Sequence, residues 1–139
     1  MGKFSKAVEG FGKKARLRAL ATFRQAAQET MHAANLPVGQ GGRMRVDTGF
    51  LKGSIQASLE GMPSGPTEGT KGKVYRDQVA GSPAELVILE AELGDKIWVG
   101  WTAKYARVRE YYDGFLKSAA QRWPATVKRV AAIVKARIP

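Results

Sequence analysis

Glycine and proline are concentrated in one third of this 139-residue chain, and their distribution is the strongest constraint on its fold. Residues 36–83 hold ten of the sixteen glycines and four of the six prolines. Runs such as residues 39–42 and 62–66 cannot lie inside a regular helix or strand, because proline removes a backbone donor and glycine is conformationally free. Most regular elements are therefore expected outside this stretch, and residues 60–83 are expected to form a long flexible loop.

Residues 11–35 show the periodicity of a helix. Apolar side chains recur three or four positions apart and predict one buried stripe: Phe11, Ala15, Leu20, Phe23, Ala27, Met31 and Ala34. The run Asn35-Leu36-Pro37 ends the helix, since proline disfavours helical backbone in the residue before it. Gly10 and Gly12 weaken the preceding segment, so residues 1–10 are expected to be a mobile N-terminus.

The middle of the chain predicts short elements. Asp47 or Thr48 is expected to cap a single helical turn that leads into a strand at residues 54–59. A further short strand is expected at residues 73–75. Residues 84–91 are rich in branched apolar side chains and predict another strand, which would form an antiparallel hairpin with residues 96–101 around the turn Gly94-Asp95.

The C-terminal part predicts helices at residues 103–112 and from Phe115 almost to the end. Pro124 leaves two alternatives, a kink or a second helix with proline in its first turn. These elements make an α+β fold in which a long N-terminal helix and C-terminal helices pack on a small antiparallel sheet. The length suits one domain spanning residues 1–139.

Composition excludes several kinds of chemistry. The chain has no cysteine and one histidine, His32, so it has no disulfide scaffold, no thiolate zinc site and no multi-histidine metal site within one protomer. No apolar run reaches the ~18 residues that span a bilayer. The first residues do not read as a secretory signal. We therefore expect no cofactor, no metal and no membrane partner.

Positive charge lies at both ends of the chain. Lysine and arginine number 23 against 12 acidic residues, a net charge of +11. Residues 1–24 and 114–139 each carry +6, and the middle is close to neutral. Such ends favour contact with a polyanion or an acidic protein surface. The candidate interface residues are Lys13, Lys14, Arg16, Arg18, Arg24, Lys128, Arg129, Lys135 and Arg137.

Catalytic motifs are weak in this sequence. Asp47-Thr48-Gly49 matches the tripeptide of aspartic proteases, in which two carboxylates share a proton. Those enzymes are nearly all-β, and the tripeptide should follow an apolar strand that is absent here. No other set of side chains suggests a nucleophile or general base, so the chain is not expected to be an enzyme. Six aromatic residues could stack on unpaired bases, but they fall on predicted strand and helix positions, so a role in the core or at a subunit interface is favoured. They are Trp98, Trp101, Tyr105, Tyr111, Tyr112 and Trp123.

Three short motifs together resemble a known family. Residues 47–55, Asp47-Thr48-Gly49-Phe50-Leu51-Lys52-Gly53-Ser54-Ile55, are similar to the "D-T-G-x-L-x-x-S-I" box of the tail-completion (minor tail component) proteins of long-tailed bacteriophages. Residues 105–111 resemble the second box, "Y-A-x-x-V-E-x-G", through Tyr105, Ala106, Val108 and Glu110, with Gly114 in place of its glycine. Residues 115–120 resemble the third, "F-L-x-x-A", through Phe115 and Leu116.

The resemblance implies a structural virion protein of the neck or tail. Such a protein assembles in the host cytoplasm into a homo-oligomeric ring, expected to be a hexamer or dodecamer. The ring joins the tail tube to the head-closure ring, beside head-closure, tail-terminator or tail-tube proteins. DNA passes through the lumen without sequence-specific binding. Because many phosphate contacts would hinder sliding DNA, we favour an acidic protein partner for the basic helices; the alternative function is a basic nucleic-acid-binding protein.

Overall fold

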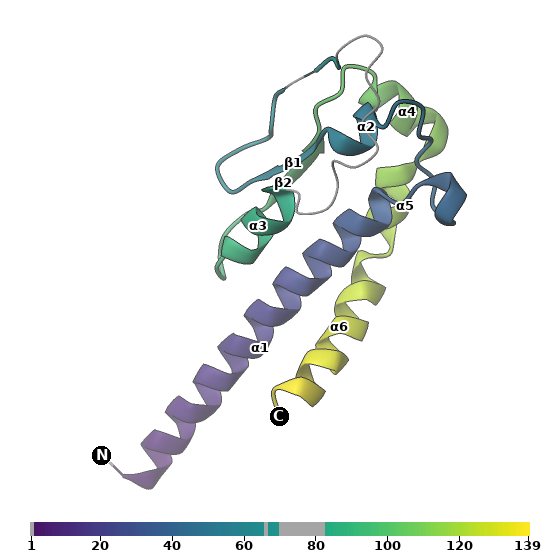
Figure 1. Cartoon of the computed structure of the whole chain (residues 1–139). Helices are drawn as coiled ribbons and strands as arrows, with labels where there is room; N and C mark the ends of the chain where they lie inside the picture. The colour runs from purple at the N-terminus through teal and green to yellow at the C-terminus, as the bar shows by residue number, and fades with distance from the viewer. Residues whose placement is uncertain (1, 66, 70–82) are drawn as a thin grey trace.

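One long helix, α1 (Lys3–Ala34), runs through the computed structural model, which describes residues 2–65, 67–69 and 83–139 (Figure 1). Its 32 residues span about 48 Å at 1.5 Å per residue. The expected start at residue 11 is wrong, because residues 3–10 already form the first turns. Gly10 and Gly12 each disfavour the helix by only about 1 kcal/mol relative to alanine, and neither removes a backbone hydrogen bond as proline would. The end at Asn35 is confirmed.

Short elements follow in the glycine-rich middle. They are the 3₁₀ turn η1 (Val38–Gln40), the one-turn helix α2 (Phe50–Gly53) and the strand β1 (Ile55–Ser58). The predicted single turn and the strand after it are thereby confirmed. Residues 59–65 and 67–69 contain no helix or strand. The strand expected at residues 73–75, and most of the flexible loop expected at 60–83, lie outside the described residues.

The strand predicted at residues 84–91 is wrong, because this segment forms the helix α3 (Pro83–Glu90). Ala84, Ile88 and Ala91 are buried, and their spacing of four and then three residues is that of one helix face. Alanine, leucine and glutamate are strong helix formers, and they outweigh the two branched residues Val87 and Ile88. Periodicity alone does not distinguish a short apolar strand from a buried helix.

The predicted hairpin between residues 84–91 and 96–101 is therefore also wrong, because the second strand pairs with a different segment. The strand β2 (Trp98–Trp101) pairs antiparallel with β1, with Ile55 opposite Trp101 and Ser58 opposite Trp98. Within the described residues this pair is the whole sheet. It connects segments about forty residues apart in the sequence, and α3 packs beside β1.

Three helices complete the chain: α4 (Ala106–Asp113), α5 (Phe115–Gln121) and α6 (Trp123–Arg137). Pro124 lies in the first turn of α6, so the second of the two alternatives holds. Figure 1 shows α6 running antiparallel along α1, with α3 and the sheet on the other side of α1 and with α2 and α4 at its C-terminal end. The fold is therefore α+β.

The buried side chains form three clusters. The motif cluster contains Met44, Phe50, Leu51, Ala103 and Phe115. The sheet cluster contains Met31, Ile55, Ala84 and Ile88. The helix cluster contains Ala26, Val130 and Val134.

The predicted stripe of α1 is buried only toward its C-terminal end. Met31 and Ala34 are buried, but Phe11 and Ala15 are exposed. The reason is tertiary: α6 ends beside Arg18, whose Nε donates to the carbonyl of Ile138 at 2.6 Å. Residues 3–17, named the overhang from here on, lie beyond that point.

Candidate functional site

The three motifs of the sequence meet in one region, at the C-terminal end of α1. Leu51 of the first motif and Phe115 of the third are buried in the motif cluster, and Ala106 of the second packs against it. Trp101 packs edge-on against Phe115, with ring centroids 5.0 Å apart and an interplanar angle of 73°. Segments more than fifty residues apart in the sequence therefore share one core.

The first motif builds the one-turn helix α2. Gly49 occupies its N-cap position with φ of 89°, a left-handed conformation that favours glycine. The hydroxyl of Thr48 accepts the Phe50 N–H at 3.3 Å. At the other end, the Ser54 hydroxyl donates to the Leu51 carbonyl at 2.7 Å. The expectation that Asp47 or Thr48 is the N-cap residue is therefore wrong: Gly49 holds that position because its backbone is left-handed, Thr48 supports the turn from one residue earlier, and Asp47 is exposed.

Direct hydrogen bonds join the first motif to the segment that precedes the second. The Thr102 N–H donates to the Ser54 carbonyl at 3.2 Å. Burial raises the pKa of the Tyr105 phenol, a hydrogen bond with the Leu51 backbone lowers it in part, and the nearby Asp47 carboxylate raises it again. Tyr105 therefore lies against both the turn and the acid of the first motif.

Glu110 joins the second motif to the third. Its carboxylate accepts the Leu116 N–H at 2.7 Å and the Lys117 N–H at 3.0 Å. These amides belong to the first turn of α5 and have no partner within the helix, so a carboxylate there satisfies both donors and complements the helix dipole. Gly114 between α4 and α5 has φ of 65°, which allows the chain to turn back toward Glu110.

The remaining motif residues are less central. Ile55 is buried in the sheet cluster rather than in the motif cluster. Val108 and Leu116 are exposed. The motifs therefore contribute both to the core and to the surface around it.

Sequence reasoning missed an ion pair beside the motif cluster. The Asp113 side chain is only 6% exposed and accepts from Arg109 Nε at 3.0 Å and from Arg109 Nη2. Arg45 Nε, in the segment before the first motif, lies 3.7 Å from the same carboxylate. The spacing of Arg109 and Asp113, four residues apart, is the signal that would have indicated this pair.

The nine candidate basic residues divide into two groups. Four make contacts within the chain: Arg18 with Ile138, Arg24 with Ala91 and Glu92, Arg129 with Glu29, and Arg137 with Gln25. Among the described residues, the other five form no ion pair, namely Lys13, Lys14, Arg16, Lys128 and Lys135.

The fold gathers the two basic ends of the sequence. Because α6 runs antiparallel to α1, residues of the first 24 positions lie beside residues of the last 26 (Figure 1). The two segments carry +6 each. The antiparallel pair of α1 and α6 is thus positively charged, and it is named the positively charged rod.

Exposed apolar and aromatic side chains are numerous for a chain of this size. Among the described residues, large apolar or aromatic side chains are more than a third exposed on α1, α3, α4 and α6. Tyr111 and Tyr112 stand exposed on α4, edge-on to each other at 5.2 Å. Trp98, Trp123 and Tyr105 are also partly exposed, while Trp101 donates its indole N–H to Asn35 at 2.9 Å.

An apolar groove of about 490 Å³ opens between α1, β2 and the start of α6. Its lining includes Phe23, Met31, Ile97, Trp98 and Trp123. Large apolar patches on soluble chains commonly mark protein interfaces. The groove and the α4 tyrosines are therefore candidate subunit surfaces.

Comparisons with protein-family models, curated proteins and solved structures found no match for this chain. Within the described residues, no cluster of three or more potential metal ligands is present. None of the described helices combines the length and apolar character needed to cross a bilayer. Asp47-Thr48-Gly49 begins a helical turn in an α+β fold, which differs from the strand-borne tripeptide of aspartic proteases.

Proposed function

We propose that this protein is a structural virion component of a long-tailed bacteriophage, a neck or tail protein that assembles into a ring between the tail tube and the head-closure ring. The observation that carries the proposal is the meeting of the three motifs in one hydrogen-bonded unit. Packing and hydrogen bonds link residues of all three motifs there, namely Leu51, Tyr105, Glu110 and Phe115. Such links are expected if the motifs define one structural module rather than three chance matches.

The surface supports an assembling role. The exposed α4 tyrosines, the apolar groove and the overhang are all apolar features that a neighbouring subunit would cover. A protein of a ring needs two different surfaces of this kind, because each copy contacts one neighbour on either side.

The positively charged rod supports contact with an acidic protein of the neck, while DNA slides through the lumen. The same rod is the one observation that favours the second candidate, a basic nucleic-acid-binding protein. Phosphate binding by lysine and arginine releases counterions, so its affinity falls steeply as salt rises.

The test of the proposal is the mass and shape of the purified full-length chain. Native mass spectrometry and electron microscopy are expected to show a closed oligomer with a central opening. A single subunit at every protein concentration would overturn the ring.

The second candidate is tested on the same preparation with duplex DNA. For the ring protein we expect weak retention at physiological salt. Strong retention, lost steeply across a salt series, would favour the nucleic-acid-binding function instead.

A further inference from the structure

The overhang carries an apolar stripe that nothing in the described chain covers. Phe4, Val8 and Phe11 are 82%, 53% and 72% exposed. They are spaced four and three residues apart, so they lie on one face of α1. Continued along the helix, that face reaches Ala26, which Val130 and Val134 of α6 bury. The stripe is therefore an extension of the α6-binding face beyond the end of α6.

The overhang is also positively charged. Residues 3–17 contain five basic side chains and one acidic side chain, a net charge of +4. Two overhangs placed against each other would repel, because like charges at an interface disfavour association. A matching surface must therefore be apolar and acidic.

The outer face of α3 and the turn after it has that composition. Leu86, Leu89 and Leu93 are 58%, 51% and 45% exposed. Residues 83–95 contain four acidic side chains and no basic one. Glu85 and Glu90 flank these leucines around the helix: Glu90 is exposed on the side opposite to buried Ile88, and Glu85 is half-buried on the side toward α1. The surface formed by Leu86, Leu89, Leu93, Glu85 and Glu90 is named the acidic leucine face.

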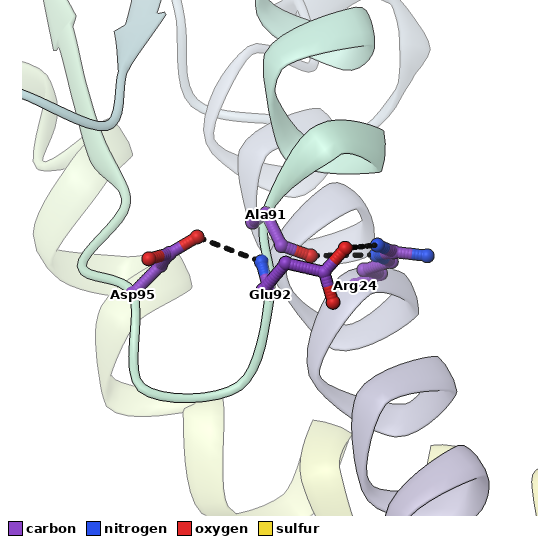
Figure 2. Close-up of polar contacts among 4 residues, drawn as sticks. All are labelled: Arg24, Ala91, Glu92 and Asp95. Atoms are coloured by element: carbon purple, nitrogen blue, oxygen red, sulfur yellow. Dashed lines mark hydrogen bonds and ion pairs between the residues drawn. The ribbon is translucent and has the colours of Figure 1, made fainter.

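Contacts with α1 hold this face in place. Arg24 donates through Nε to the Ala91 carbonyl at 2.8 Å and lies 3.4 Å from Glu92, and the Asp95 carboxylate accepts the Glu92 N–H at 2.8 Å (Figure 2). His32 Nε2 lies 2.9 Å from Glu85. The face is thus pre-formed before any partner binds, which lowers the entropic cost of association.

A protomer cannot bring its own stripe onto its own acidic leucine face. The stripe lies on the α6 side of α1, and α3 packs on the other side (Figure 1). α1 continues as a helix through the overhang, which keeps the stripe pointing away from α3.

We propose that the overhang of one copy docks on the acidic leucine face of the next copy. Phe4, Val8 and Phe11 cover Leu86 and Leu89, and Lys3 and Lys14, which lie beside the stripe on the helix surface, face the glutamates that flank these leucines. Because the two surfaces differ, the contact is head-to-tail, and repetition closes into a ring where the rotation allows it. This inference rests on the proposed ring assembly and names its subunit interface.

The test is a charge-swap experiment on the full chain, with self-association measured by sedimentation and native mass spectrometry. An overhang variant (Lys3→Glu, Lys14→Glu) and a face variant (Glu85→Lys, Glu90→Lys) are each expected to raise the dissociation constant at least tenfold. An equimolar mixture of the two, and a chain carrying all four changes, are expected to regain association. The matched control, Lys128→Glu with Lys135→Glu on α6, is expected to associate like the wild type.

The outcomes separate this interface from the ring itself. A wild-type chain that stays monomeric overturns both proposals. A wild-type ring whose swapped variants still assemble, or whose mixture does not recover, overturns the docking and leaves the ring standing. Assembly that stops at two copies also overturns the docking, since a head-to-tail contact has no such limit. Circular dichroism checks that the variants fold, and Phe4→Ser with Phe11→Ser is expected to lose association without any charge change.

Discussion

The two ends of α1 differ sharply in how their side chains are used. At the C-terminal end, residues from α1, the sheet, α3, α5 and the motif segments close over one another, and polar groups such as Asn35 and Glu110 have partners within the chain. At the N-terminal end, the overhang exposes three large apolar residues of one face. The side chains at the C-terminal end are packed and paired within the chain. The apolar side chains of the overhang would be buried only by association with another molecule. Stability and assembly should therefore respond to mutation at opposite ends of the same helix.

The largest contrast is expected between two phenylalanines. Phe115 is 3% exposed and packs against Trp101, so Phe115→Ala should lower the free energy of unfolding by about 3–5 kcal/mol. Phe11→Ala, in the overhang, should change it by less than about 0.5 kcal/mol. Urea unfolding of both variants at a concentration where the chain is monomeric measures the difference. Equal losses would refute the contrast between the two ends.

A second pair of variants tests the helical state of α3. Ile88 is buried and Leu86 is exposed, whereas alternation in a strand would place both side chains on the same face. Ile88→Ala should cost about 2–5 kcal/mol of unfolding free energy, and Leu86→Ala should cost less than about 0.5 kcal/mol. Chemical denaturation measures both losses of unfolding free energy. Similar losses at the two positions would contradict the helix and support a strand at residues 84–91.

A smaller effect is expected where Glu110 caps α5. Glu110→Ala removes the acceptor of two backbone amides and should cost about 0.5–2 kcal/mol, the range for a lost N-terminal cap. The matched control is Glu9→Ala in the overhang, which should stay within about 0.5 kcal/mol. Thermal unfolding at low salt gives both values. A neutral Glu110→Ala would show that water replaces the carboxylate without loss.

The smallest effect concerns Tyr105 and alkaline pH. Its raised pKa means that the unfolded chain releases the phenol proton first, so this contribution to stability is present below about pH 10 and is lost as pH rises through the folded pKa. Because Tyr105 is 42% exposed, water can replace its hydrogen bond, and Tyr105→Phe should lose no more than about 0.5 kcal/mol at neutral pH. It should also flatten the fall in stability between about pH 9 and 11. An unchanged slope would contradict the assignment.

Local elements were predictable where the sequence signal is short-range. Pro37 ends α1, Pro124 starts α6, and Thr48 and Gly49 make the turn of α2, all through the backbone chemistry of neighbouring residues. The prediction of a strand at residues 84–91 failed because an eight-residue apolar segment has no local feature that distinguishes helical from strand periodicity. Burial of Ile88 against β1 and α1 decides it, and those contacts are non-local.

The candidate site was predicted in part. The sequence supplied the three motifs, the charged ends and the choice of basic residues, but not which arginines are used within the fold. Arg24 and Arg129 were both predicted as basic interface residues. In the fold, Arg24 pairs with Glu92 and Arg129 pairs with Glu29. Their acidic partners are 68 and 100 positions away, beyond the reach of any pattern in neighbouring residues.

The sequence alone determined that this chain is an α+β protein with basic helices at both ends, because propensity, proline and glycine act over a few residues. Only the tertiary structure decided that β1 pairs with β2, that the two basic ends lie side by side, and that the apolar stripe of α1 is covered at Ala26 and open at Phe4. Those outcomes depend on which distant segments share a core, and the free energy of that choice lies in packing between segments rather than within them.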